Sequence, residues 1–467
     1  MRRRSARLAL YLSLAAAGAV TYALAAWLGA AVRPEAVSWN KVNYGSLPEV
    51  QLLQRYIAVD TSEESGSTAA GAEFLADVLR GAGIEPTIER LDERTANLWA
   101  IVDGDDPRAI VLHHHIDVDP IAQRERWDHP PFGGQIDGPW IYGRGAFDMK
   151  SVAIAQLDAL IALRRSGRRP ARSVIFLATA GEERGSGLGM RWVLATHPEL
   201  VRRFAVVLTE GGAVEGRSTE EVKYWGTEFA QKRLIRVTIC DQSRQRLNAL
   251  HHELIAFGCG LNSFTLTPEV AAFLAHYAPT RDGEELRRLL AEPRALLRDL
   301  PAFDRLPDYL QSLFRNEAVP YPVEEAPGGG YQMPINLQLL PGADVERVVT
   351  DLLPPWRLHG LTVAVYDEGG AAHGSPVDHP VLTTIAEVIG EHYPGVPVGP
   401  LMLPWTATDS RFLRARGISS YGFSPFMVLT PEVLRIVQGK PVDERIALPG
   451  YVEGVKIYGE VLDRLTR

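Results

Sequence analysis

The stretch Val111-Leu-His-His-His-Ile-Asp-Val-Asp-Pro120 places three histidines and two aspartates directly after a short apolar run. The run Ala109–His113 is typical of a buried β-strand. If the backbone stays extended beyond it, His115 and Asp117 stand two residues apart and point to the same side. A histidine that binds a metal through one ring nitrogen needs its other nitrogen oriented, and a nearby carboxylate does this. The stretch therefore predicts a metal ligand at a strand end, with a merely polar strand end as the alternative.

Acidic residues at two further places carry related chemistry. Asp148 follows a glycine-rich turn and precedes a helix predicted over Lys150–Ser166, where a carboxylate can bridge two cations; a helix N-cap is its alternative role. Glu182 and Glu183 follow a strand predicted over Ser173–Ala178. In metal-assisted hydrolysis one such carboxylate binds the metal and the other takes a proton from the bound water. A solvated acidic turn is the alternative for this pair.

Glu210 completes the pattern at the end of a strand predicted over Phe204–Leu208. The carboxyl ends of successive strands meet in the crevice where open α/β sheets bind ligands. Each acidic position alone is a weak signal. Their common placement after strands predicts one metal site at one edge of a sheet.

Strands alternating with helices predict an α/β sheet covered on both faces. The pattern changes near Thr219, where a long strand over Phe229–Cys240 begins a compact α+β set, and the α/β pattern resumes after Gly369. A helical, Arg- and Leu-rich segment interrupts this insert. The predicted parts are an N-terminal segment (1–33), the first part of the α/β domain (34–218), the inserted domain (219–368) and the second part of the α/β domain (369–467).

The N-terminal segment contains 25 consecutive uncharged residues, Leu8–Val32, after four arginines among the first seven residues. As a helix of ~1.5 Å per residue it would be about 38 Å long, enough to cross a ~30 Å hydrocarbon core. The basic flank predicts that the rest of the chain lies outside the cytoplasm. A cleavable signal peptide, with secretion of the remainder, is the alternative. Its apolar core is usually ~7–15 residues, so the length favours an uncleaved membrane anchor.

Composition narrows the chemistry of the predicted site. The formal net charge is −8, with 49 Lys+Arg against 57 Asp+Glu among 467 residues, which excludes a protein built to coat nucleic acid. Two cysteines exclude a disulfide scaffold and a thiolate zinc finger. A metal site must therefore use His, Asp and Glu.

These motifs together resemble the co-catalytic zinc metallopeptidases that include aminoacylase, glutamate carboxypeptidase, succinyl-diaminopimelate desuccinylase and carboxypeptidase S. The resemblance runs from about Leu47 to the C-terminus. It is most specific over His115–Lys150 and Ala178–Ser186, and it returns at Thr408–Phe412 and Tyr421–Pro425.

The resemblance implies a zinc-exopeptidase-like α/β domain, a mixed sheet flanked by helices, with an inserted α+β ferredoxin-like lid that often dimerises. It also implies one or two zinc ions. The residues to which it assigns a role are His115 (first zinc ion), Asp117 (orientation of His115), Asp148 (bridge between the ions), Glu182 (general base), Glu183 (second zinc ion) and Glu210 (first zinc ion). Arg411 is expected to pair with a substrate carboxylate, which its guanidinium fits bidentately, or else to form a surface salt bridge.

The C-terminal part departs from the family pattern. The family carries a fifth zinc ligand there, a histidine, but the last histidine of this chain is His392. Gln438 or Lys440 takes the matching position, and neither side chain is a good zinc ligand. Replacement by Asp443 or Glu444 is a conjecture that the sequence leaves open.

The lid departs as well. Relatives carry a Gly-His-Ser-type loop after the first lid strand, whereas the nearest histidines here, His251 and His252, fall on a predicted helix. Gln338 stands where relatives commonly place an arginine. A rival motif, His113-x-His115-x-Asp117, resembles part of the metallo-β-lactamase signature. That signature requires a histidine directly after the aspartate, so this hypothesis is set aside.

Three functions follow from these observations. The first is a membrane-anchored zinc hydrolase that cleaves a peptide or N-acyl amino-acid amide bond beside a free carboxylate. The second is an impaired or inactive homologue with a binding or regulatory role, which the missing histidines favour. The third, a purely structural membrane module, has no positive feature in the sequence.

Overall fold

We analysed a computed structural model of the protein. It describes residues 42–62, 66–216, 221–256, 260–354, 360–367, 369–370, 373–429 and 442–467. Residues Gly45–Arg467 form one compact unit. The predicted apolar segment Leu8–Val32 lies outside the described residues. Within the ranges just given, every helix falls short of the length and apolar character that a membrane span needs.

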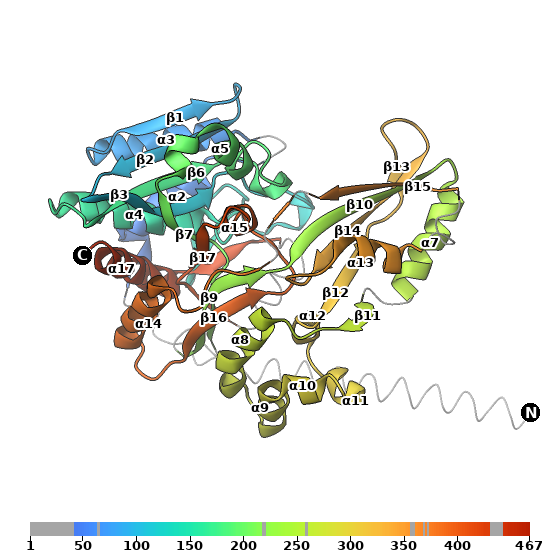
Figure 1. The fold of residues 1–467 in the computed structure, drawn as a ribbon. Coiled ribbons are helices and arrows are strands. Elements are labelled where there is room, and N and C mark those ends of the chain that lie inside the picture. Colours follow the sequence, from blue (N-terminus) through green and yellow to red (C-terminus); the bar gives the residue numbers. More distant parts are fainter. Residues whose placement is uncertain are drawn as a thin grey trace, which may run out of the picture. The chain divides into compact units, whose positions relative to one another are not determined.

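A ten-stranded mixed sheet forms the larger layer (Figure 1). Its order is β1-β2-β6-β3-β7-β17-β9-β8-β18, and β16 pairs with β9. Four neighbouring central strands run parallel: β6 (Arg172–Thr179), β3 (Asp106–His115), β7 (Phe204–Thr209) and β17 (Ser419–Gly422). The other strands are β1 (Pro86–Arg90), β2 (Ala96–Val102), β8 (Ala213–Gly216), β9 (Val222–Gln231), β16 (Val398–Leu403) and β18 (Met427–Leu429).

Helices cover both faces of this sheet, as the continuous apolar runs of its strands predict. On one face, Val111, Ile175 and Val207 pack against α5 (Met190–Thr196) and α15 (Ser410–Arg414). The residues of β3 directly before and after Val111 point to the opposite face, because side chains alternate along a strand.

On the opposite face of the sheet, His114 Nδ1 lies 3.0 Å from Gln156 Oε1 of α4 (Lys150–Arg165), so α4 covers this second face. Helix α17 (Leu448–Leu465) packs against α4. Further helices of the unit are α2 (Pro48–Ile57), α3 (Thr68–Gly81), α6 (Pro198–Val201) and α14 (Pro380–His392).

A separate antiparallel sheet forms the lid, with the order β11-β12-β14-β10-β15 and with β13 beside β14. Its strands are β10 (Arg233–Asp241), β11 (Gly260–Phe264), β12 (Arg315–Pro320), β13 (Glu324–Glu325), β14 (Tyr331–Leu339) and β15 (Thr362–Asp367). Helix α7 (Arg244–Ala256) follows β10 and α13 (Val345–Leu352) follows β14. When β11, β13 and the helices between β11 and β12 are set aside, the remaining elements follow the order βαββαβ, which confirms the predicted ferredoxin-like lid.

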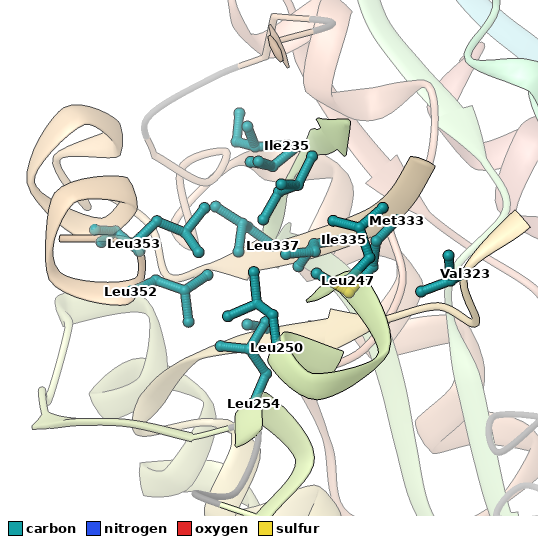
Figure 2. Close-up of a cluster of buried hydrophobic side chains, with 14 of the residues drawn as sticks. Ile235, Leu247, Leu250, Leu254, Val323, Met333, Ile335, Leu337, Leu352 and Leu353 are labelled. Carbon is teal, nitrogen blue, oxygen red and sulfur yellow. The ribbon is translucent and has the colours of Figure 1, made fainter. Parts of the chain in front are cut away.

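The lid has an aliphatic core between one face of its sheet and its two helices. Alternate residues of β10 and β14, among them Ile235, Ile335 and Leu337, are fully buried there. Figure 2 shows these side chains together with Leu250 of α7 and Leu352 of α13. The period of two along the strands therefore decides which sheet face the helices cover.

The predicted long strand Phe229–Cys240 is in fact two strands. The chain leaves the large sheet after β9 and enters the lid sheet at β10, so the lid sheet begins at Arg233, later than the expected boundary near Thr219. The residue between the strands, Lys232, is fully buried, and its Nζ donates to Glu317 Oε2 at 2.6 Å. The sequence around Lys232 gave no local sign of this transfer between sheets.

The Arg- and Leu-rich segment is helical, as predicted, and lies between β11 and β12. Its helices are α8 (Pro268–Tyr277), α9 (Glu284–Ala291), α10 (Pro293–Leu296), α11 (Leu300–Phe303) and α12 (Asp308–Ser312). A third, small sheet joins β4 (Gln135–Asp137) and β5 (Trp140–Tyr142) to β19 (Arg445–Ala447), which brings the C-terminal part of the chain beside the loop that precedes α4.

Candidate metal centre

Three parallel strands deliver the predicted site residues to one edge of the large sheet. His115 is the last residue of β3, the pair Glu182–Glu183 follows β6 after Ala180 and Gly181, and Glu210 follows β7 directly. Because β3 pairs with both neighbours in parallel, all three strands end at the same edge. The strands therefore bring these residues to one edge of the sheet.

His115 is the centre of the closest group of donor atoms. Its Nδ1 lies 2.8 Å from the backbone oxygen of Asp117, which accepts only if Nδ1 carries the proton. The other nitrogen, Nε2, faces Asp148 Oδ1 at 3.1 Å and Glu210 Oε2 at 3.6 Å, and in the neutral imidazole it carries a lone pair. Donor atoms of these three residues lie within 4.8 Å of one another.

This donor set fits a divalent cation. A lone pair and two carboxylate oxygens repel one another unless a positive charge lies among them. The two carboxylates also favour a positive charge on His115. Burial opposes the charged form of the imidazole, but the carboxylates of Glu210 and Asp148 outweigh burial and raise its pKa well above the usual range. One imidazole and two carboxylates are ligands that zinc accepts in proteins.

Asp117 orients His115, but not through the side chain that the sequence predicted. Its backbone oxygen, rather than its carboxylate, orients His115, since Oδ1 is 3.7 Å from Nδ1. The carboxylate instead accepts the backbone N–H of Glu182 at 3.2 Å and that of Glu183 at 3.1 Å. Asp117 is almost fully buried, so it fixes the turn that carries both glutamates.

Glu182 and Glu183 lie beside the three donors. Burial and the carboxylate of Glu210 raise the pKa of Glu182 well above its usual range. Burial and the carboxylate of Asp148 raise the pKa of Glu183 to about 10. Among the described residues, the donor atoms within 4.8 Å of one another come from His115, Asp148 and Glu210, and Glu183 stands outside that set.

Arg411 is not a surface residue. Its side chain is only 6% exposed, and Nη1 donates to the backbone oxygen of Thr408 at 3.1 Å. The same nitrogen lies 3.7 Å from Glu182 Oε1. Arg411 therefore stands next to the predicted base, and the alternative of a surface salt bridge is wrong.

Two buried residues near the centre were not predicted to have a role. His113 Nδ1 lies 2.9 Å from Thr209 Oγ1 and Nε2 lies 2.9 Å from Thr179 Oγ1, which ties together the ends of β3, β6 and β7. Asp409 accepts a short hydrogen bond from the Ser186 hydroxyl, beyond the Glu182–Glu183 turn. The His113–His115 run and the Thr408–Phe412 motif were the only local signals for them.

Only some of the C-terminal residues considered for the position of the missing histidine belong to the described residues. Gln438 and Lys440 lie outside the described residues. Asp443 accepts the backbone N–H of His129 at 3.1 Å, and Glu444 pairs with Arg144 at 2.8 Å. Neither carboxylate belongs to the close donor set of the described residues, so the conjecture that one replaces the missing histidine receives no support from these contacts.

The two histidines of the lid lie on the helix-covered side of the lid sheet. His251 and His252 are on α7, whose leucines form the lid core. The other sheet face bears a cavity of about 660 Å³, lined by polar side chains that include Arg236 and Asn336. Gln338, on that same face by alternation, donates from Nε2 to the backbone oxygen of Trp405 at 3.3 Å.

A mixed α/β sheet with an inserted antiparallel lid and a His–carboxylate centre at the strand ends defines a metallohydrolase. More narrowly, the chain belongs to Peptidase family M20/M25/M40, whose model matches residues 111–464. The family resemblance seen in the sequence is thereby confirmed.

Individual relatives agree with this membership. The chain is 39% identical over 140 residues to a succinyl-diaminopimelate desuccinylase of Paracoccus denitrificans, a match that spans 29% of this chain but only 35% of that protein. It is 24% identical over 444 residues to aminoacylase-1A of Rattus norvegicus, covering 90% of this chain and 95% of the relative. The fold matches the M20 family metallo-carboxypeptidase Sso-CP2 of Sulfolobus solfataricus with a TM-score of 0.66 at 16% identity, over 89% of this chain and 98% of the other.

Proposed function

We propose that the protein is a zinc-dependent hydrolase that cleaves a peptide bond or the amide bond of an N-acyl amino acid. One observation carries the proposal: a buried imidazole, two carboxylates and a fixed Glu182–Glu183 turn converge at one sheet edge. Family membership and the names of the relatives, a desuccinylase, an aminoacylase and a carboxypeptidase, support the amide-bond chemistry.

His115, Asp148 and Glu210 would hold the ion, which supplies Lewis-acid activation of the scissile carbonyl and of water. Glu182 is the general base that accepts the proton of the attacking water and returns it to the leaving amine. Asp117 keeps Glu182 in place through the backbone N–H.

Arg411 is proposed to bind the substrate carboxylate. Its guanidinium is 3.7 Å from Glu182, so a carboxylate paired with it would lie within reach of the base. A second ion, if bound, would lie between Asp148 and Glu183, whose charges already act on one another. With the C-terminal histidine missing, this second ion is expected to bind more weakly than the first.

The second candidate is a homologue of low or no activity with a binding role. The absence of any histidine after His392 and the glutamine at position 338 favour it. It would keep the fold and the first ion, and it would bind an N-acyl amino acid or dipeptide without turnover.

Two further proposals concern the setting of the enzyme. The apolar segment Leu8–Val32 is proposed to anchor the chain in a membrane with the hydrolase outside the cytoplasm. Dimerisation through the lid is proposed because β15 is an edge strand with Val365 and Tyr366 about half exposed. Membrane fractionation with protease protection tests the first, and sedimentation velocity in detergent tests the second.

The central experiment is zinc stoichiometry on the purified full-length protein, followed by hydrolysis assays on a panel of N-acyl amino acids and dipeptides. At least one bound zinc ion and a turnover that Glu182→Gln lowers by ~10²–10⁴-fold are expected, since that is the usual contribution of a general base. Zinc without turnover, together with measurable substrate binding, would establish the second candidate. A protein with neither zinc nor turnover would contradict the proposed hydrolase.

A further inference from the structure

A buried carboxylate lies beneath the loop that carries Asp148. It belongs to Glu444, which is 2% exposed and immediately precedes strand β19. Glu444 is almost 300 residues away from this loop in sequence, and the pairing of β19 with β5 brings the two together. The backbone N–H of Gly143 also donates to the backbone oxygen of Glu444 at 2.9 Å.

Both oxygens of Glu444 are occupied by donors from the loop. Oε1 accepts the backbone N–H groups of Phe147 at 2.8 Å and of Asp148 itself at 3.0 Å. Oε2 accepts the backbone N–H of Gly145 at 3.0 Å and Arg144 Nη1 at 2.8 Å. Four donors use the acceptor capacity that an ionised carboxylate has, so none is left for a cation.

Other backbone hydrogen bonds hold the two ends of the loop: the N–H of Arg144 donates to the oxygen of Pro131 at 2.7 Å, and the N–H of Lys150 donates to that of Gly145 at 2.8 Å. The N–H groups of Phe147 and Asp148, between these ends, donate to Glu444. Gly145 has a φ of +81°, and a Cβ there would lie 2.6 Å from Val118, so the close approach depends on glycine. The side chain of Asp148 is half exposed. Its position relative to His115 and Glu210 is thus set by its backbone, and the backbone is held by Glu444.

We infer that Glu444 is a positioning residue for the cation ligand Asp148, an inference that rests on the proposed metal centre. Glu444 acts through backbone hydrogen bonds and does not itself bind the ion. It ties the C-terminal part of the chain, which lacks the histidine of the family pattern, to the metal centre. Partners that orient a ligand typically change metal affinity by ~10–100-fold when they are replaced.

The test compares Glu444→Gln with a matched variant. Glutamine keeps the size of the side chain but turns an N–H₂ toward the donors of the loop. Glu215 provides the control because it also pairs with a buried arginine, Arg281, and accepts the Tyr277 hydroxyl at 2.7 Å, while none of its hydrogen bonds comes from the loop of Asp148. Glu215→Gln should therefore disturb stability without disturbing the metal centre.

Zinc affinity is measured on full-length proteins in detergent, with Zn²⁺ in competition with a chelating dye. We expect Glu444→Gln to weaken Zn²⁺ binding by ~10–100-fold and Glu215→Gln to leave it within about twofold. In the metal-free protein, amide exchange in the peptide spanning 143–150 should rise in Glu444→Gln alone. Equal zinc affinity in the two variants would overturn the inference.

The wild-type protein provides a test that does not depend on the variants folding. Its amides at Gly145, Phe147 and Asp148 should be protected from exchange without metal, because their acceptor is buried. Exchange of these amides at the rate of an open loop would also overturn the inference. Since exchange needs neither turnover nor zinc, a failure of the proposed hydrolase and a failure of the positioning role remain distinguishable.

Discussion

The metal-centre edge of the large sheet and the lid are stabilised by different chemistry. At the edge, buried polar groups hold one another: His113 lies between two threonine hydroxyls, and the carboxylate of Asp117 accepts two backbone N–H groups. In the lid, aliphatic side chains from β10, β14, α7 and α13 fill one face of the sheet. The edge depends on charge and hydrogen bonding, whereas the lid depends on apolar packing.

This difference matches where the chain keeps and where it loses the family pattern. The edge retains every predicted first-ion ligand, and these residues converge. The lid retains its fold but carries Gln338 in place of an arginine and has no histidine loop. Apolar packing specifies the lid fold without specifying its polar face, so the residues that contact substrate can change there while the fold persists.

Removal of the central imidazole should have the largest effect. We expect His115→Ala to lower Zn²⁺ affinity by more than ~100-fold and turnover by at least ~10⁴-fold, which corresponds to about 5 kcal/mol of transition-state stabilisation. Metal analysis and progress curves on the same preparation measure both. His251→Ala on α7 is the control and should change neither, and zinc retained at wild-type affinity in His115→Ala would refute the assigned centre.

A large-to-small change in the lid core comes next. Leu337 is fully buried in the aliphatic cluster, so Leu337→Ala should cost about 2–5 kcal/mol in the unfolding free energy of the lid. Denaturant unfolding and limited proteolysis measure the loss. Zn²⁺ affinity should remain unchanged, because the cavity forms in apolar packing away from the donor set.

The milder Ile335→Val serves as the graded control, with about 0.5–1.5 kcal/mol expected. A fall in zinc affinity that followed lid stability through this pair would show that the two regions depend on each other. The metal-centre edge and the lid would then not be stabilised independently.

Acid should destabilise the metal-centre end of the sheet through His114. Burial lowers the pKa of His114 to about 3, and its Nε2 has no hydrogen-bond partner within the described structure. Between pH 6.5 and about 3 the unfolded chain binds a proton that the folded chain excludes, so stability is lost as the pH falls through this window. His114→Gln should remove about 1.4 kcal/mol per pH unit of that dependence, or about 3 kcal/mol between pH 6 and pH 4.

Urea unfolding of wild type and variant at both pH values measures the slope. His252→Gln is the control because His252 is exposed on α7 and meets water in both states. An unchanged slope in His114→Gln would mean that His114 accepts its proton without unfolding the edge.

Features that depend on residues close together in the sequence could be predicted from it. Features that depend on contacts between distant segments could not. The run Ala109–His113 with His115 after it is a local pattern, and it correctly located the strand β3, which ends at His115. The contacts of Glu444 with residues 144–148 join segments about 300 residues apart, and no periodicity or spacing encodes such a contact. Lys232 shows the same limit, because the exchange of sheets at that residue depends on partners distant in the chain.

The smallest effect is expected where the two regions touch. Tyr366 of β15 accepts a hydrogen bond from Arg191 Nη1 of α5 at 3.2 Å, and its side chain is about half exposed. Because water can replace an exposed partner, Tyr366→Phe should change the unfolding free energy by less than about 1 kcal/mol and leave Zn²⁺ affinity unaltered. Tyr321→Phe is the matched control, since the Tyr321 hydroxyl accepts Asn336 Nδ2 at 3.2 Å within the lid and is similarly exposed. Exchange of the β15 amides should rise in Tyr366→Phe alone. A loss of several kcal/mol, or a loss of zinc affinity, would show that this contact couples the apolar lid to the polar edge.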